Sequence, residues 1–277
     1  WDADKGRFIG CVDVTGRQWD FGFTYLNLEA ITYGLATPEQ AAAIFDWLDG
    51  RRTIAGDKQK VGEKMTGATG DEIYALGWAP RSTTRAVESV TVAGKHWWWH
   101  LGNQITVAGP EANAGYGEHL ENGGAIFYVS HYDLMARLRT FGPDNAWKRF
   151  ASILAEFRQD QLQRDPPNNK GAAWKWGIIG EFPESGLVPA TVALGFMGLD
   201  ATPAALFIKP RLPRALPWLE VRHVAYRGNV YRVRADAGAI QIRCVQATEK
   251  PGRVICDDQP AVALPGPGQT VTVKRRP

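Results

Sequence analysis

Carboxylate side chains recur in three parts of the sequence, each shortly before a strongly apolar stretch. The pairs are Asp13 with Asp20, Glu118 with Glu121, and Glu181 with Glu184. Transfer of a glycosyl group needs a protonated carboxylic acid at the leaving oxygen, and hydrolysis with inversion adds a carboxylate that holds water. Phosphorolysis dispenses with that base, because phosphate is the nucleophile and needs cations instead. The pattern therefore predicts carboxylate acid–base chemistry.

Two of these carboxylates are the predicted catalytic pair. Glu181 lies in a loop bounded by Gly and Pro, and Trp174 and Trp176 come shortly before it. Aromatic neighbours can raise the pKa of a carboxyl group, as a general acid requires. Glu121 precedes Gly123, where its alternative role is a charge near a helix start. We predict that Glu181 is the general acid or base and that Glu121 is its partner or anchors the substrate.

The sequence also contains groups that suit sugar binding. It has 11 tryptophans, and the run Trp97–Trp99 is hard to bury whole. Flat rings that stay partly wet can stack on sugar faces. The predicted substrate-binding residues are Trp97, Trp98, His100, His119, Asn122, Trp174, Trp176 and Asp20. Each has a structural alternative: a core tryptophan, a loop histidine or, for Asp20, the N-cap of a helix.

Composition excludes several other classes of function. The 277 residues are 44% hydrophobic with a net charge of +3, and the longest basic run is Lys274–Arg276. That is too little for a nucleic-acid surface, and no apolar stretch reaches the roughly 18 residues of a membrane span. No zinc-type His or Cys motif and no phosphate loop occurs. We therefore expect a carbohydrate partner, with no metal, cofactor, nucleic acid or membrane.

The elements that must position these groups are helices in the first two thirds of the chain. Nearly all-apolar segments, typical of inner helices, alternate with one-faced segments, typical of outer helices. Asp20 is the expected N-cap of the first helix and Gly34 its end. Thr37-Pro38-Glu39-Gln40 has the pattern of a capping box. The predicted helices span residues 21–33, 38–48, 125–140, 145–162 and 187–197.

From Leu206 onward the apolar period changes to two, which predicts a small antiparallel β-domain. The predicted strands cover residues 206–209, 221–226, 230–235, 240–246, 254–257 and 271–274. A turn centred on Lys250 would place Cys244 opposite Cys256. This pair is either a disulfide, which would indicate a periplasmic or secreted protein, or two free thiols. The location of the protein is otherwise left open.

Three motifs in this order resemble the six-hairpin (α/α)6 glycosidase superfamily. They are Glu-Asn-Gly-Gly at 121–124, Gly-Glu-Phe-Pro-Glu-Ser-Gly at 180–186, and Pro-Arg-Leu-Pro at 210–213. Cellobiose-phosphorylase-like, rhamnosidase-like and debranching-type members share this layout. The resemblance implies a catalytic, partial α/α toroid at 1–203 and a C-terminal antiparallel β-domain at 204–277. It also implies a ligand cleft at the N-terminal ends of the inner helices.

The leading functional prediction is a glycoside hydrolase that acts on an oligosaccharide or glycoside with inversion of the anomeric configuration. One alternative is a glycoside phosphorylase, for which Arg81-Ser82-Thr83-Thr84 could supply a cation and hydroxyls unless it is a surface turn. Another is a non-catalytic carbohydrate-binding module of the same fold. A toroid has six hairpins, so we expect a missing N-terminal segment or a second chain to complete it. The inner helices should then show an exposed apolar flank.

Overall fold

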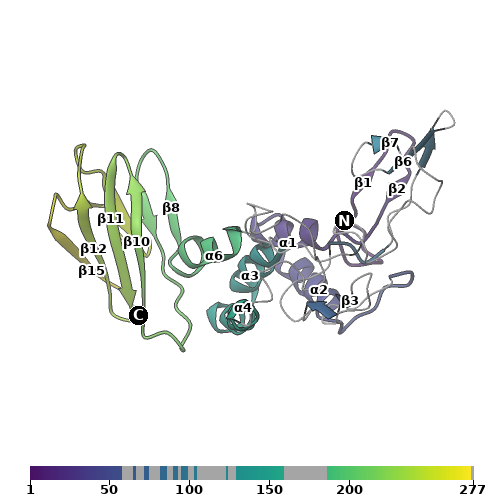
Figure 1. The fold of residues 1–277 in the computed structure, drawn as a ribbon, viewed down its shortest axis with the longest axis horizontal. Helices are drawn as coiled ribbons and strands as arrows, with labels where there is room; N and C mark the ends of the chain where they lie inside the picture. Colours follow the sequence, from purple (N-terminus) through teal and green to yellow (C-terminus); the bar gives the residue numbers. More distant parts are fainter. Residues whose placement is uncertain are drawn as a thin grey trace, which may run out of the picture. The chain divides into compact units, whose positions relative to one another are not determined.

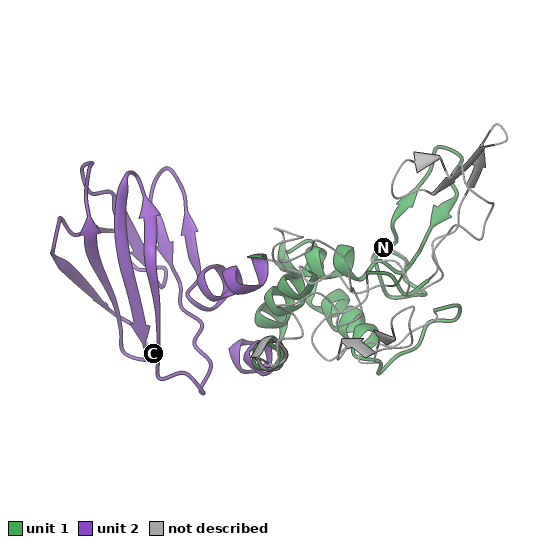
Figure 2. Ribbon diagram, in the orientation of Figure 1, with its two compact units in different colours: residues 1–140, 149–186 green, residues 141–148, 187–277 purple. Residues whose placement is uncertain are grey.

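The computed structural model describes residues 1–57, 65–66, 72–74, 82–85, 90–92, 95–98, 103–104, 123, 129–158 and 186–275 (Figure 1). The chain divides into two compact units (Figure 2). Unit 1 comprises Trp1–Thr140 and Arg149–Gly186, and unit 2 comprises Phe141–Lys148 and Leu187–Pro277. Unit 1 contains most of the helices, and unit 2 contains the β-domain. A helical part followed by a β-domain agrees with the predicted fold class.

Unit 1 is built on helices α1 (Thr24–Thr32), α2 (Pro38–Leu48) and α3 (Val129–Thr140), with most of α4 (Pro143–Arg158). Helix α1 packs against both α3 and α2. Their shared core consists of Leu28, Ile31, Ala41, Ile44, Phe45, Trp47, Leu48, Val129 and Ala136. The described ends of α3 and α4 agree with the sequence, but residues 125–128 and 159–162 of the predicted helices lie outside the described residues.

Helix α1 ends as predicted but begins later. Gly34 has φ +77° and donates to the carbonyl of Ile31 at 3.1 Å, as expected where a helix ends on a left-handed residue. At the other end the prediction was wrong, because the N-cap is Phe23, without a side-chain hydrogen bond. The carboxylate of Asp20 instead accepts from the backbone N–H of Gly22 at 3.0 Å. Residues 21–23 therefore lie between Asp20 and the helix, and Phe23 has an extended backbone conformation.

The capping box of α2 is confirmed. The Thr37 hydroxyl accepts from the backbone N–H of Gln40 at 3.2 Å, and the Gln40 side chain accepts from the Thr37 N–H at 2.9 Å. Pro38 takes the first helical position, where its missing N–H has no consequence. The buried residues of α2 include the predicted face (Ala41, Ile44, Phe45 and Leu48).

Helix α3 buries charge as well as apolar surface. Arg137 donates to Asp133 at 2.8 Å and also pairs with Asp49, just after α2. Arg149 of α4 lies 2.9 Å from the same Asp133 carboxylate. These ion pairs connect α3 with α4 and with the end of α2.

Unit 1 also contains short strands. Strand β1 (Cys11–Val12) pairs with β2 (Gln18–Trp19), and β3 (Met65–Thr66) pairs with β4 (Glu72–Tyr74). A three-stranded sheet has the order β5–β6–β7. Its strands are Val90–Val92, Lys95–Trp98 and Asn103–Gln104.

The longer stretch of unit 2 begins at Leu187 with a helical turn that runs into a π-helical turn. The segments are α6 (Leu187–Thr191) and η3 (Val192–Phe196), so the predicted helix at 187–197 is confirmed. Gly198 follows at φ +64°, and a Cβ there would lie 2.2 Å from the carbonyl oxygen of Lys209. Glycine is therefore needed where the chain turns into the first strand.

The β-domain of unit 2 consists of two four-stranded sheets with a shared core. One has the order β10–β11–β12–β15, with strands Trp218–Tyr226, Asn229–Asp236, Ala239–Gln246 and Thr270–Lys274. The other has the order β14–β13–β9–β8, with strands Val262–Ala263, Arg253–Cys256, Leu206–Ile208 and Leu199–Ala201. The core includes Leu206, Ile208 and Val254 from one sheet and Tyr231, Val233, Ile240 and Ile242 from the other.

Two expectations about the β-domain were wrong. Strands β9 and β13 pair in parallel, because three strands of the other sheet intervene between them in the chain. For the same reason β12 and β13 do not form a hairpin about Lys250. Cys244 and Cys256 lie in the core as free thiols, with exposed fractions of 1% and 2%. Without a disulfide, the argument for a periplasmic or secreted protein has no structural support.

The expected apolar flank is not visible along α1 or α3. Among their described side chains no large apolar residue is exposed, although Tyr33, directly after α1, is 68% exposed. In unit 2, Leu194 of η3 is 45% exposed. No helix of the described residues has the length and hydropathy to cross a membrane.

Candidate functional site

Asp20 is the one predicted site residue whose side chain the structure describes. Trp97 and Trp98 lie in β6, where their backbones pair with Gln104 and Asn103 of β7. The remaining predicted residues fall outside the described part of the chain: Glu181, Glu121, His100, His119, Asn122, Trp174 and Trp176. The geometry available for the site is therefore that of the loop that leads into α1.

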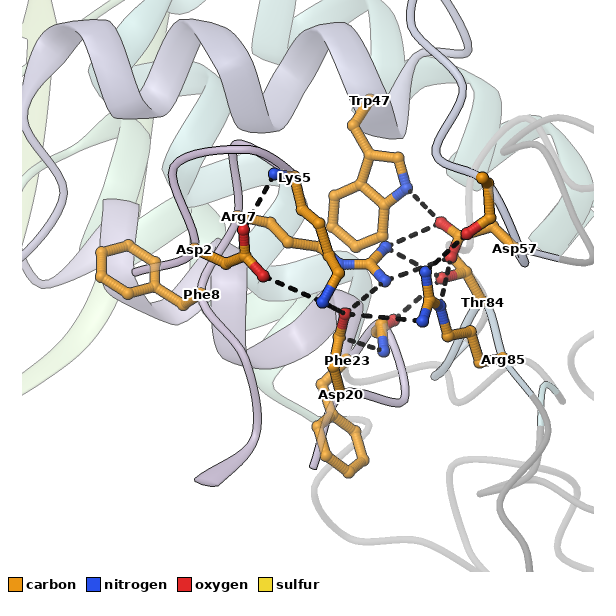
Figure 3. Close-up of polar contacts among 12 residues, drawn as sticks. Asp2, Lys5, Arg7, Phe8, Asp20, Phe23, Trp47, Asp57, Thr84 and Arg85 are labelled. Carbon is orange, nitrogen blue, oxygen red and sulfur yellow. Dashed lines mark hydrogen bonds and ion pairs between the residues drawn. The ribbon is translucent and has the colours of Figure 1, made fainter. Parts of the chain in front are cut away.

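Asp20 lies in a buried ion-pair network at the start of α1 (Figure 3). Its side chain is 5% exposed. Arg7 donates to the Asp20 carboxylate at 2.9 Å, and the Lys5 ammonium lies 3.1 Å from the same oxygen. The second oxygen accepts from the Gly22 N–H, so both carboxylate oxygens of Asp20 have partners.

A second aspartate, Asp57, completes the network on the other side of Arg7. The Arg7 guanidinium binds it in bidentate fashion, with N–O distances of 2.7 and 3.1 Å. Arg85 donates to Asp57 at 2.8 Å and the Trp47 indole N–H at 2.9 Å. Figure 3 shows these donors converging on one carboxylate from three different parts of the chain.

Arg7 is the centre of the network and is fully buried. Its guanidinium carbon lies 4.5 Å from the centroid of the Trp47 ring, and one of its nitrogens lies 3.3 Å from the Thr84 hydroxyl. Sequence reasoning missed Arg7 and Asp57. They are 50 residues apart and belong to no motif, so only the tertiary structure brings them together.

The charges explain why these aspartates are unsuited to acid catalysis. Burial acts to raise the pKa of Asp20 and of Asp57. The hydrogen bonds and charge of Arg7, with those of Gly22 and Lys5 at Asp20 and of Arg85 and Trp47 at Asp57, outweigh burial and hold both pKa values below the usual range. Two ionised carboxylates are thus matched by Arg7, Arg85 and Lys5. A general acid needs a raised pKa. The network is therefore built to hold the loop in place, not to donate a proton.

Backbone bonds fasten the same loop to residues 82–85. The N–H of Thr24 donates to the carbonyl of Ser82, and the N–H of Thr84 donates to that of Gly22, both at 3.0 Å. The hydroxyl residues of the predicted phosphate segment, Ser82–Thr84, are at most 3% exposed. They are therefore buried and do not form a surface turn. Arg81 lies outside the described residues.

Asp13, the other carboxylate before α1, organises the turn between β1 and β2. Its carboxylate accepts from the Thr15 hydroxyl at 2.6 Å and the Trp19 indole N–H at 2.9 Å. These hydrogen bonds lower the pKa of Asp13 to about 2. Asp13 is therefore also a poor general acid. Within the described ranges no three His, Cys, Asp or Glu residues gather as metal ligands would.

Comparison with known proteins finds one family model that is similar to part of the β-domain. Residues 202–262 match the family model described as "Glycosyl hydrolase family 65, C-terminal domain". A "Putative kojibiose phosphorylase from human microbiome" is similar in structure, with a TM-score of 0.37 and 14% sequence identity over 54% of this chain and 17% of that one. The chain thus spans about a sixth of that protein's length. No curated protein matches the sequence.

The family match falls within unit 2, from the segment before β9 to the start of β14. It agrees with the predicted resemblance to the six-hairpin glycosidase superfamily in the part of the chain that the match covers.

Proposed function

We propose that this chain is part of a glycoside hydrolase that acts with inversion on an oligosaccharide or glycoside. The observation that carries the proposal is the family match of residues 202–262, which follow a helical region with carboxylates in the loops before its helices. In this proposal the helices of unit 1 are part of an α/α toroid. A further segment or a second chain would complete it.

The catalytic carboxylates in this proposal are Glu181 and Glu121. Support comes from the aspartates before α1, since Asp13 and Asp20 both have lowered pKa values and fully engaged oxygens. Neither is suited to protonate a leaving group at neutral pH. Glu181 follows two tryptophans that could raise its pKa, so it is the better acid. Asp20 then serves as a positioning residue for the loop at the start of α1.

The test is the pair of substitutions Glu181→Gln and Glu121→Gln in the full-length protein. Each keeps the size of the side chain but removes its acid–base function, so turnover should fall by ~10²–10⁴. The matched control is Glu249→Gln, an exposed glutamate of the β-domain, which should leave turnover unchanged. If both site variants lose less than about tenfold, the catalytic assignment is wrong.

Two further measurements separate hydrolysis from the alternatives. Product release from a glycan library is compared with and without inorganic phosphate, and the anomer of the first product is read by NMR. A hydrolase should turn over without phosphate, and inversion requires a carboxyl pair spaced to admit water. Strict dependence on phosphate would identify a phosphorylase instead. Glycan binding without turnover would indicate a non-catalytic module.

A further inference from the structure

The sheet β10–β11–β12–β15 has one face in the core of the β-domain and one face in solvent. Along β11, Tyr231 and Val233 are buried, whereas the intervening Arg232 and Arg234 point away from the core. The outward residues of neighbouring strands follow from the register, in which Arg234 is opposite Glu220 of β10 and Arg232 is opposite Arg243 of β12.

This outer face is strongly cationic. It carries the cations Arg222, Arg232, Arg234, Arg243 and Lys274. The carboxylates in the same rows are Glu220 and Asp236, and Asp236 is engaged by the N–H groups of the turn that follows it. Glu220 is shared, with Arg222 at 2.6 Å and Arg232 at 3.9 Å. The face therefore has more positive charge than its own carboxylates can neutralise.

The cross-strand pair Arg232 and Arg243 is the least compensated part of the face. Like charges directly opposite each other destabilise a sheet. The buried Nε of Arg232 has no hydrogen-bond partner, and the Arg243 side chain forms no ion pair or hydrogen bond among the described residues. The two arginines line a hollow of about 200 Å³ with Cys244, Val245 and Gly268. An anion in this hollow would relieve the repulsion and satisfy the guanidinium donors.

An exposed aromatic ring lies on the same face. Trp218 of β10 is 46% exposed, and the guanidinium carbon of Arg234 lies 4.3 Å from its ring centroid. This contact holds the indole in place beside the cationic rows. A fixed, half-exposed indole suits stacking against the apolar face of a sugar. The face thus combines guanidinium donors for carboxylates with a platform for a sugar ring.

We propose that this face of the β-domain binds an acidic polysaccharide, with uronate carboxylates on Arg232 and Arg243 and a sugar ring on Trp218. Charge complementarity calls for a polyanion, and the choice of a glycan rests on the function proposed above. A nucleic acid is less favoured, because single-stranded nucleic acids are bound on several stacked rings, whereas one tryptophan lies on this face. The catalytic carboxylates proposed above lie in another part of the sequence.

The experiment is affinity electrophoresis of the full chain in native gels that contain polygalacturonate. Retardation should be strong with this polymer at low salt and absent with neutral dextran. Arg243→Gln should weaken binding roughly fivefold, as expected for one exposed charge pair, and the Arg232→Gln/Arg243→Gln double variant more. Trp218→Ala should weaken it without a change in net charge. Unchanged melting temperatures would establish that the variants are folded.

The matched control is Arg253→Gln, an exposed arginine of β13 in the other sheet. It removes the same charge from the same domain and should change the affinity for polygalacturonate less than twofold. Equal weakening by Arg243→Gln and Arg253→Gln would overturn the proposal, because it would indicate attraction by net charge alone. Failure to bind, equal retardation in dextran, or binding only to dextran sulfate or to a single-stranded oligonucleotide would overturn it as well.

The electrophoresis measures binding to the polymer and does not depend on turnover. Loss of the proposed hydrolase activity and loss of this surface can therefore be told apart. If the chain binds polygalacturonate through Arg243 but hydrolyses no glycan, the proposed binding surface is supported and the proposed hydrolase activity is wrong. If the chain hydrolyses a glycan but does not bind polygalacturonate through Arg243, the hydrolase activity is supported and the binding surface is wrong.

Discussion

Replacing Arg7 by methionine tests whether the ion-pair network holds the loop before α1. Methionine approximates the length of the side chain but cannot donate hydrogen bonds. The change removes the bidentate contact with Asp57, the contact with Asp20 and the contact with Thr84. The two aspartates, with side chains 5% and 7% exposed, then lose their central cation.

The expected loss in the free energy of unfolding depends on the ion pairs that the two aspartates keep in the variant. Removing one partner of a buried ion pair typically costs ~3–5 kcal/mol, because it leaves a buried charge without compensation. Here Arg85 still donates to Asp57, and Lys5 still lies beside Asp20. We therefore expect the lower end, a loss of about 3 kcal/mol in the free energy of unfolding. For a chain of this size that corresponds to a fall in melting temperature of roughly 6–12 °C.

The assay is denaturant and thermal unfolding followed by circular dichroism. The matched control is Arg51→Met, because Arg51 pairs with Asp46 and Asp49 but is 54% exposed. That variant should lose at most about 1 kcal/mol. If Arg7→Met is no more destabilising than Arg51→Met, the network does not hold the loop and our reasoning is refuted.

The same experiment has a signature in its pH dependence. The pKa of Asp57 is lowered from its usual 3.8, so its ion pairs contribute stability above that pH, and the contribution is lost as the pH falls through the lowered value. In Arg7→Met the uncompensated carboxylates can be neutralised by protonation. The difference in stability between the wild type and the variant should therefore be largest near pH 7 and shrink below about pH 4. A constant difference from pH 7 to pH 3 would exclude an electrostatic cause.

Further predictions concern local features of the chain. Thr37→Ala should destabilise by about 1 kcal/mol in denaturant unfolding by removing the α2 cap, whereas Thr37→Ser should not. Gly16 has φ +83° with open space around it, so Gly16→Ala should lower the free energy of unfolding by ~1–2 kcal/mol. Gly22→Ala, at φ +62° with its Cβ 1.9 Å from a threonine hydroxyl, should cost about 2 kcal/mol more by the same measurement. Cys11 is exposed and should react quickly with a thiol reagent, whereas the two core cysteines should react only after unfolding; three fast thiols would contradict the β-domain core.

The features that the sequence predicted well depend on residues close together in the chain. The capping box of α2 involves four consecutive residues, and Gly34 and Gly198 end helical segments through their own backbone conformation. The strands β11 and β12 follow from alternation and from the turns beside them. In each case the interaction that decides the structure lies within one turn or one hairpin, so it is visible in a short stretch of sequence.

The features that the sequence missed depend on distant partners. Asp20 has the sequence signature of an N-cap, but Arg7 and Lys5 bind its carboxylate, and the helix begins later. Cys244 and Cys256 are symmetric about a turn signal, but the chain crosses to the other sheet between them. Local propensity gave the wrong outcome in both cases, because tertiary contacts decide which local option is used.

The network before α1 also bears on where chemistry could occur if the proposed function is right. A buried ion-pair cluster is seldom the most stable way to fill a core, and well-packed apolar side chains often do better. What the network does provide is one defined path for residues Asp20–Phe23, held by Arg7 from the N-terminal segment and by Thr84 from a distant one. The superfamily resemblance predicts a ligand cleft at the start of inner helices, and α1 is one of the helices predicted to be inner. A fixed entry into α1 is what a precise carboxylate geometry there would require, because catalytic groups depend on supports that do not move.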